Sequence, residues 1–291
     1  MYSNGKPNYN EIIFSDKEVE EIVDLYLNQK MSSVKIGKLY NVSYRTILRL
    51  LHRNDIVVDQ KRFVRHYDLN EHYFDTIDNQ DKAYILGLLY ADGSNSISKS
   101  TVSISLQEED VEILELIRNM VDSSKPLEYL DYSNKHDFGY NYKNQYRLLL
   151  FSKHMCSTLQ QIGMVANKSL KLEFPNIDES LYSHFIRGYF DGDGSLVQQI
   201  KNDNNHPVLV TITSTKKFCN TINKIIKENL NIKGCITDAS CKNGITKVLS
   251  ISGRNVCKTF LDWIYKDANL YLKRKYKRYL DYYNINNSLS A

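Results

Sequence analysis

The sequence predicts an α+β protein built from two similar units, with a small all-helical unit in front of them. Three observations lead to this prediction. A nine-residue motif occurs twice, each copy is followed by an alternating stretch typical of a strand, and residues 15–56 show helical periodicity. With 291 residues, 42% hydrophobic and 25% charged, the chain has the size and composition of two or three globular domains.

The repeated motif reads ILGLLYADG at residues 85–93 and IRGYFDGDG at residues 186–194, so each position recurs 101 residues later, which indicates a duplicated unit. Residues four apart share one face of a helix, so each predicted helix carries a stripe of small residues. Two such stripes let two helices approach closely. The predicted helix-helix interface consists of Gly87, Ala91, Gly188 and Gly192.

Both motif copies end in an aspartate followed by a glycine. We expect Gly93 and Gly194 to end the helices in the left-handed conformation that favours glycine. Close packing then brings Asp92 and Asp193 together at helix C-termini, where the macrodipole and their mutual repulsion disfavour negative charge. A divalent cation relieves this conflict, and hard oxygen ligands select Mg²⁺ or Ca²⁺. One such segment alone is usually an amphipathic helix that ends in a turn. Two such segments in register predict a functional site.

The two segments resemble the LAGLIDADG motif of homing endonucleases, and the resemblance covers most of residues 76–284. It implies two pseudo-symmetric αββαββα repeats that form a DNA-binding saddle within one monomeric chain. It also implies a Mg²⁺-dependent, site-specific endodeoxyribonuclease that makes a double-strand break in a long target, as in intron homing by mobile genetic elements. Mn²⁺ is expected to substitute for Mg²⁺, and Ca²⁺ to bind without supporting cleavage.

The resemblance assigns roles within the motif. The eighth position is the metal-binding acid of the family, which implies metal binding by Asp92 and Asp193, with the glycines that follow them completing the two metal positions. The sixth position is usually aspartate, and here it is Asp191 in one copy and Tyr90 in the other. This departure puts local symmetry in question more than catalysis.

The resemblance also implies one basic residue from each repeat near the acids, where it offsets charge in the transition state. Lys168 fits this role in the first repeat. In the second repeat the equivalence with the first is lost after Ile264, so both Lys273 and Lys275 are candidates. The alternative for this basic run is a solvated helix face.

The rest of each repeat follows from periodicity: helix, two strands, helix, two strands, helix. Alternation turns one side of each strand away from the core, where the resemblance implies contact with DNA. The candidate DNA-binding residues on strands are Thr101, Ser103, Ser105, Gln145, Arg147, Gln198, Thr211, Thr213, Thr246 and Ser250. The alternative is that they are ordinary solvent-facing residues of half-buried sheets.

Residues 15–56 resemble a helix-turn-helix whose last helix reads DNA. Ile47, Leu48 and Leu51 are predicted to pack inward, and a plain three-helix bundle is the alternative. The residues predicted to reach DNA are Ser43, Tyr44, Arg45 and Arg49. The predicted domains are a helix-turn-helix domain at 1–56, a linker at 57–75, and repeats at 76–174 and 175–291.

Charge and cysteine content indicate which repeat contacts phosphate and which kinds of site are unsupported. Residues 177–291 hold 17 Lys and Arg against 10 Asp and Glu, whereas residues 61–176 hold 13 against 16, so the second repeat should face phosphate more strongly. The five cysteines form an odd set without a C-x-x-C pair, so they support neither a zinc site nor a disulfide framework. No apolar run reaches the length of a membrane span, so we expect a cytoplasmic protein, encoded by a bacterium, a phage or an organelle.

Two other functions fit the same scaffold. One is an RNA-splicing maturase with intron RNA as its partner, and the other is a transcriptional regulator that binds DNA without cutting it. A regulator is free to lose its acids, yet both aspartates and both glycines are present. The sequence therefore favours active chemistry on double-stranded DNA.

Overall fold

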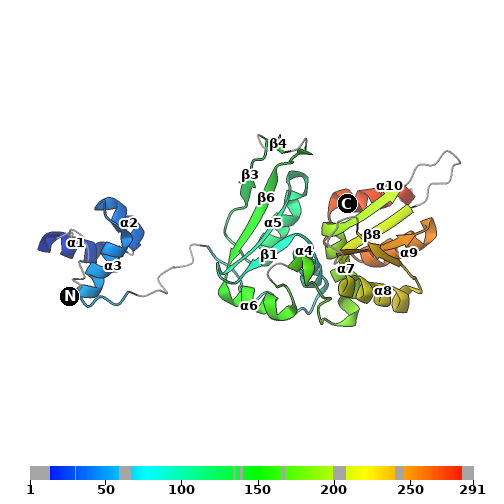
Figure 1. The fold of residues 1–291 in the computed structure, drawn as a ribbon, viewed down its shortest axis with the longest axis horizontal. Coiled ribbons are helices and arrows are strands. Elements are labelled where there is room, and N and C mark those ends of the chain that lie inside the picture. Colours follow the sequence, from blue (N-terminus) through cyan, green and yellow to red (C-terminus); the bar gives the residue numbers. More distant parts are fainter. Residues whose placement is uncertain are drawn as a thin grey trace, which may run out of the picture. The chain divides into compact units, whose positions relative to one another are not determined.

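The structure, a computed structural model, describes residues 14–29, 31–58, 67–133, 136–137, 140–165, 168–198, 208–239 and 246–283. The chain divides into two compact units, residues 1–66 and residues 67–291 (Figure 1). Residues 59–66, in the middle of the predicted linker, lie outside the described residues.

The first unit is helical throughout its described part. Its helices are α1 Asp16–Leu27, α2 Ser33–Leu39 and α3 Tyr44–Arg53. A serine caps the N-terminus of each: Ser15, Ser32 and Ser43 accept a hydrogen bond from a backbone N–H in the first turn. Ser15 also forms a capping box with Glu18.

The three helices bury a small core of aliphatic side chains, which includes Ile22, Ile36, Ile47 and Leu51. The prediction for α3 is wrong at one position, because Leu50 joins this core while Leu48 is only half-buried. Leu50 and Leu51 together follow the helical period from Ile47 better than Leu48 does, since they lie three and four residues further on.

The second unit contains two repeats of the predicted αββαββα order, and the predicted fold class is confirmed. The first repeat consists of α4 Gln80–Asp92, β1 Gly93–Ser96, β2 Thr101–Gln107, α5 Val111–Met120, β3 Glu128–Leu130, β6 Gln145–Phe151 and α6 Lys153–Ile162. The second consists of α7 Tyr182–Asp193, β7 Gly194–Gln198, β8 Val208–Thr215, α8 Lys216–Leu230, β9 Cys235–Asp238, β10 Thr246–Ser252 and α9 Arg254–Tyr265, and is followed by α10 Lys273–Tyr283. A two-stranded hairpin, β4 His136–Asp137 and β5 Tyr140–Asn141, extends the first repeat.

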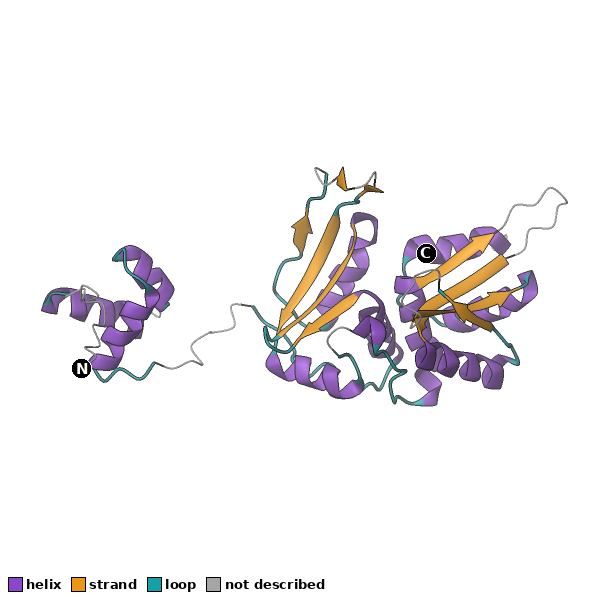
Figure 2. Cartoon of the chain, viewed as in Figure 1, coloured by secondary structure: helices purple, strands orange, loops and turns teal. Residues whose placement is uncertain are grey.

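Each repeat folds into a four-stranded antiparallel sheet, with strand order β1-β2-β6-β3 in the first and β7-β8-β10-β9 in the second. The motif glycines start the first strands in equivalent register, Gly93 opposite Ile104 and Gly194 opposite Ile212. Helices cover one side of each sheet (Figure 2). Every second residue of β2 is buried under them, so the other face of the strand stays accessible.

The two motif helices, α4 and α7, pack against each other at the centre of this unit (Figure 1). A Cβ atom on Gly87 would lie 2.1 Å from the carbonyl oxygen of Phe185, and one on Gly188 would lie 2.0 Å from that of Tyr84. No side chain fits at such distances. The two backbones therefore touch, and only glycine allows it.

The prediction of left-handed helix ends is wrong. Gly93 and Gly194 have φ −80° with ψ 162° and 160°, an extended conformation in which the chain continues directly into β1 and β7. Space, not backbone conformation, requires these glycines. A Cβ atom at either position would lie 2.6 Å from a carbonyl oxygen of the preceding helix, that of Leu89 or Phe190.

The predicted linker is also too long. Residues 67–75 belong to the second unit, where the Phe74 side chain is buried in the main core. The backbone N–H of Asn70 donates to the carbonyl of Val121, at 2.9 Å. The backbone N–H of Asp68 donates to the hydroxyl of Ser124, at 2.7 Å, and the N–H of Ser124 donates to the carbonyl of Asp68, at 3.2 Å. Within the described residues, no helix is long and apolar enough to span a membrane.

Alanine at Gly188 should lower the free energy of unfolding by about 3 kcal/mol or more, at the upper end of overpacking costs, because its methyl group meets backbone rather than a movable side chain. Urea denaturation measures the loss. Ser183→Ala on the same helix serves as the control and should change stability little. Equal stability of the two variants would contradict the packing described for α4 and α7.

Candidate metal and nucleic-acid site

The aspartates that end α4 and α7 come together where these helices meet. A Cβ atom on Gly192 would lie 2.3 Å from the Cβ of Ala91 and 2.7 Å from Oδ2 of Asp92. The Asp92 carboxylate therefore lies against the last turn of α7, next to Asp193. Both carboxylates are open to solvent on one side.

The electrostatics of this pair depend on the protein around it. Burial by the surrounding protein, with a further contribution from the charge of Asp193, raises the pKa of Asp92 from 3.8 to about 6. Burial likewise raises the pKa of Asp193, although Lys168 and Lys275 oppose the shift. Two carboxylates with raised pKa values on adjacent helix ends are a strained arrangement that a cation would relieve.

Two lysines, one from each repeat, lie at the helix ends that carry the aspartates. Lys168 Nζ donates to the carbonyl of Tyr90, at 2.6 Å, and to that of Ala91. Lys275 Nζ, on α10, donates to the carbonyls of Phe190, at 2.6 Å, and Gly194, at 2.5 Å. These ammonium groups satisfy C-terminal carbonyls and place positive charge where the helix dipoles are negative.

Burial lowers the pKa of both ammonium groups from 10.5 to about 8, against the opposing pull of nearby aspartates. Lys275 is 7% exposed, and Lys168 is half-buried. A lysine with a pKa near 8 exchanges protons close to neutral pH, which is what a catalytic acid or base requires. The site thus has one acid and one lysine from each repeat.

The structure separates the two lysine candidates of the second repeat. Lys273 lies on the exposed side of α10, where its ammonium forms an ion pair with Glu112 at 2.6 Å. The prediction of a catalytic role for Lys273 therefore does not fit the geometry, and Lys275 is the residue at the aspartates. The two positions differ by two residues, which turns the side chain to another face of the helix.

Sequence reasoning missed the buried carboxylate of Asp191, which is fully inaccessible to solvent. Its oxygens accept from the hydroxyls of Tyr84, at 3.0 Å, and Tyr265, at 2.8 Å, and from the backbone N–H of Leu272, at 2.8 Å. Burial raises the pKa of Asp191, and these hydrogen bonds oppose the shift. Asp191 thereby joins α4, α7 and α9 to the segment that leads into Lys275.

Arg187, one turn before Asp191 on α7, is also fully buried and holds the same segment. Its Nε donates to the carbonyl of Leu270 and its Nη1 to that of Ile264, both at 2.9 Å. Burial lowers the pKa of the guanidinium, and the charge of Asp191 counters this shift. The available sequence signal for this network was the charged Arg187 at a motif position that is Leu86 in the first copy.

The first repeat achieves the equivalent anchoring with a different residue. Tyr90, at the motif position of Asp191, donates its hydroxyl to the carbonyl of Ile162 at 2.9 Å, near the end of α6. Gly163 follows with φ 119°, and a Cβ there would lie 2.7 Å from the Tyr90 hydroxyl. Buried Asn95 holds the same turn by donating to the carbonyl of Met164 at 3.1 Å. The departure from the motif therefore preserves a function: it fixes the chain that leads to Lys168.

Most strand residues predicted to meet DNA lie on the faces turned away from the helices. Nine of them are half-exposed there, and Arg147 donates to the hydroxyl of Ser105 at 3.1 Å. Gln198 ends β7, opposite Val208. On α3, the four predicted residues Ser43, Tyr44, Arg45 and Arg49 are all exposed, although the Ser43 hydroxyl is used as the helix cap.

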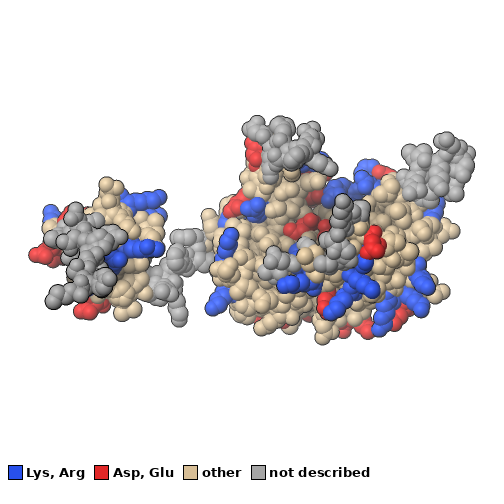
Figure 3. Space-filling view, in the orientation of Figure 1, with Lys and Arg blue, Asp and Glu red and all other residues tan. Residues whose placement is uncertain are grey.

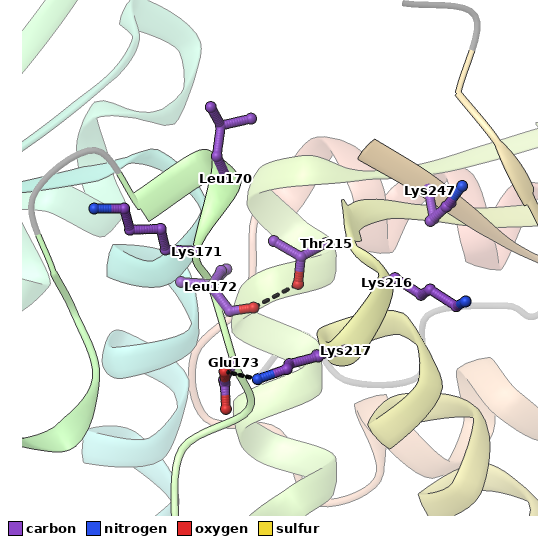
Figure 4. Close-up of a pocket in the computed structure, with 8 residues that line it drawn as sticks. All are labelled: Leu170, Lys171, Leu172, Glu173, Thr215, Lys216, Lys217 and Lys247. Atoms are coloured by element: carbon purple, nitrogen blue, oxygen red, sulfur yellow. Dashed lines mark hydrogen bonds and ion pairs between the residues drawn. The ribbon is translucent and has the colours of Figure 1, made fainter. Parts of the chain in front are cut away.

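A basic pocket of about 560 Å³, which begins two residues after Lys168 in the sequence, was not predicted. It lies between residues 170–173, the start of α8 and the start of β10, and Figure 4 shows its lysines. Lys217 pairs with Glu173 at 2.6 Å, whereas Lys171 and Lys216 have no ion-pair partner among the described residues. Figure 3 shows Lys and Arg side chains at several places on the visible face of the second repeat.

The donor chemistry of the site fits a hard divalent cation. Two carboxylates with raised pKa values reach solvent side by side, and a cation between them removes their repulsion. Gly194 is less suited to binding metal than predicted, since its carbonyl oxygen accepts from Lys275. Asp92 and Asp193 are thus the residues that would hold the metal, and Gly93 gives the chain the space to pass directly from α4 into β1.

Comparison with protein families matches residues 180–265 to the LAGLIDADG-like domain. The match covers most of the second repeat and none of the first. This match confirms the resemblance of the sequence motif for that part of the chain, and the first repeat has the same order of elements around its own copy of the motif. Comparison with curated proteins gives no match.

Solved structures of LAGLIDADG proteins are similar in arrangement but distant in sequence. Meganuclease I-SmaMI bound to uncleavable DNA has 10% identity and a TM-score of 0.48, over 69% of this chain and 88% of that one. The I-LtrWI LAGLIDADG homing endonuclease bound to target DNA has 14% identity and a TM-score of 0.47, over 74% of this chain and 90% of that one.

The raised pKa of Asp92 predicts a pH-dependent stability. The unfolded carboxyl ionises near pH 3.8 and the folded one near 6, so its contribution to stability is present below pH 3.8 and is lost as pH rises through 6. Without divalent cations, Asp92→Asn should therefore raise Tm at pH 7.5 but not at pH 4. Calorimetry in chelator tests this, and a Tm difference that is independent of pH would contradict it.

Replacing Asp191 by alanine leaves three buried donors without an acceptor, so the free energy of unfolding should fall by about 3 kcal/mol or more. Asp193→Ala, two residues further on, is the matched control. It removes an acid from an unfavourable helix end and should not destabilise the LAGLIDADG-like domain. Urea denaturation measures the free energy of unfolding of both variants. Similar losses of stability in the two variants would contradict the role described for Asp191.

Proposed function

We propose that the chain is a site-specific DNA endonuclease that makes a divalent-metal-dependent double-strand break. The observation that carries this proposal is the doubled arrangement of Asp92 with Lys168 and of Asp193 with Lys275 at two touching helix ends. A double-strand cut requires two equivalent centres close together, one for each strand. The LAGLIDADG-like domain at residues 180–265 supports the same assignment.

In each proposed centre the aspartate and the lysine have different roles. Asp92 and Asp193 would hold Mg²⁺, or Mn²⁺ in its place. When bound, the cation would supply positive charge to a phosphate and make a water more acidic. The low pKa values of Lys168 and Lys275 suit them to accept a proton from the attacking water or to offset charge on the phosphate oxygens.

The accessible sheet faces supply the binding surface in this proposal. Their polar side chains match the donors and acceptors of base edges in the major groove, and the lysines around the basic pocket match phosphates. The two repeats in one chain provide both halves of the surface, so the proposed active form is a monomer on double-stranded DNA. The helix-turn-helix candidate in the first unit would read adjacent sequence through α3.

A cleavage selection on a long randomised duplex library with Mg²⁺ tests the proposal. The wild type should produce ends clustered at one extended site. Asp92→Asn and Asp193→Asn should bind this site but leave it uncut, because they lose a metal ligand rather than the binding surface. Asp122→Asn, which keeps an exposed left-handed position that asparagine tolerates, is the control and should cut normally.

Substitutions at Lys273 and Lys275, both on α10, give a more specific test of the proposed active site. Lys275→Met should slow cleavage by about 100-fold or more, the usual cost of removing one charge-stabilising group, while Lys273→Met should cut at the wild-type rate. If the wild type also binds the DNA and leaves it uncut, as the aspartate variants should, the proposal is wrong. That result would favour a regulator or a maturase, for which RNA binding would be measured next.

Deleting residues 1–66 should shorten the protected DNA footprint and weaken binding while leaving the cut position unchanged. The reason is that a tethered second reader adds affinity without building the catalytic centre. Footprinting of the full chain and of residues 67–291 measures this. An unchanged footprint would show that the first unit is a helical bundle without a role in DNA recognition.

A further inference from the structure

A cluster of metal-binding side chains lies away from the aspartates, where the start of the second unit meets α6. Asp75 Oδ2 contacts His72 Nδ1 at 2.7 Å, and Asp75 Oδ1 contacts His154 Nε2 at 2.6 Å. One ligand atom from each of these three residues lies within 4.8 Å of the other two. All three side chains are exposed, so an ion from solvent can reach them.

The three residues are held on well-anchored backbone. The turn that carries His72 and Asp75 is closed by the Asp75 N–H, which donates to the His72 carbonyl at 3.0 Å, and buried Phe74 fixes it to the core. His154 lies in the first turn of α6. The N-cap of that helix, Ser152, donates its hydroxyl to Glu71 at 2.8 Å, which ties the two segments together. Such anchoring restrains the ligands before a metal binds.

The donor set differs in kind from that of the aspartate pair. Two imidazoles and one carboxylate suit Zn²⁺ and similar transition metals, whereas a pair of carboxylates suits Mg²⁺. Three protein ligands around Zn²⁺ lie about 3.3 Å apart when the metal–ligand distances are about 2.0–2.1 Å. The two imidazoles contact different oxygens of Asp75, at 2.7 and 2.6 Å, and only one of these oxygens is the ligand. The contact of that oxygen with its imidazole needs to lengthen by about 0.6–0.7 Å on this geometry.

The protons that these contacts share do not prevent binding. A neutral imidazole that donates to Asp75 can carry its proton on the other ring nitrogen instead, which frees a lone pair for a metal. Hydrogen bonds from His72 and then from His154 lower the pKa of Asp75, so its carboxylate is already ionised near neutral pH. The Thr158 hydroxyl, on the next turn of α6, donates to Asp75 Oδ1 at 3.3 Å and orients it further.

We propose that His72, Asp75 and His154 form a Zn²⁺-binding site that fastens residues 72–75 to α6, with a fourth position open to water. This site is independent of the proposed endonuclease activity. It links the chain segment that enters the second unit, only a few residues before α4, to the helix that covers the first sheet. Zn²⁺ binding would therefore stabilise the first repeat at the end where the first unit is attached.

Isothermal titration with Zn²⁺, on full-length protein made without a histidine tag and freed of metal by a chelator, tests the proposal. The wild type should bind one Zn²⁺ per chain in this way and gain Tm. His154→Ala and Asp75→Asn should each lower the affinity by more than about 100-fold, since even outer-shell partners of a metal are worth about 10- to 100-fold. Circular dichroism of both variants verifies that they are folded.

Two controls separate this site from other metal-binding groups. His52→Ala, which removes an exposed histidine of the first unit, and Asp193→Asn should bind Zn²⁺ as the wild type does. Co²⁺ as a second probe should give visible d–d bands without a thiolate charge-transfer band, which excludes the cysteines. Undiminished binding by His154→Ala and Asp75→Asn, or no stoichiometric Zn²⁺ binding by the wild type, would overturn the proposal.

Discussion

The contact between the backbones of α4 and α7 is the constraint on which the rest of the structure depends. Gly87 and Gly188 allow it, and any Cβ atom at either position would meet a carbonyl oxygen of the facing helix at about 2 Å. Because the helices touch along their length, their last residues are forced together. The two sheets follow directly from these helix ends, so the same contact sets the position of both repeats around the aspartates.

The contact creates an electrostatic problem that the structure solves only in part. Lys168 and Lys275 satisfy the C-terminal carbonyls and supply positive charge, yet the pKa values of both aspartates remain raised. A bound divalent cation would remove the remaining unfavourable interaction of the two negative charges. The sixth motif residue anchors the chain segment that precedes each lysine. In the second repeat it is Asp191, whose buried carboxylate accepts from the backbone N–H of Leu272, and in the first repeat it is Tyr90, whose hydroxyl donates to the carbonyl of Ile162. The repeats thus reach similar geometry with different chemistry.

The fold was predictable because its strongest signals are local and repeated: glycine spacing on two helices, and alternation along β2 and β8. The aspartate pair followed from the same spacing. Features that depend on three-dimensional neighbours were not predictable. The extended conformation of Gly93, the choice of Lys275 over Lys273, and the contacts of Asp191 all rest on segments distant in sequence. The histidine cluster likewise joins residues about 80 positions apart, which no periodicity reveals.

In the proposed enzyme the packed helix ends bind divalent cations through the carboxylates of Asp92 and Asp193. Anomalous scattering from crystals soaked in Mn²⁺ locates such cations directly. We expect an anomalous peak within bonding distance of the carboxylates of Asp92 and Asp193, and its loss in the variant with asparagine at both positions. A peak that persists in that variant, or wild-type crystals with no peak at these residues, would contradict metal binding by the two aspartates.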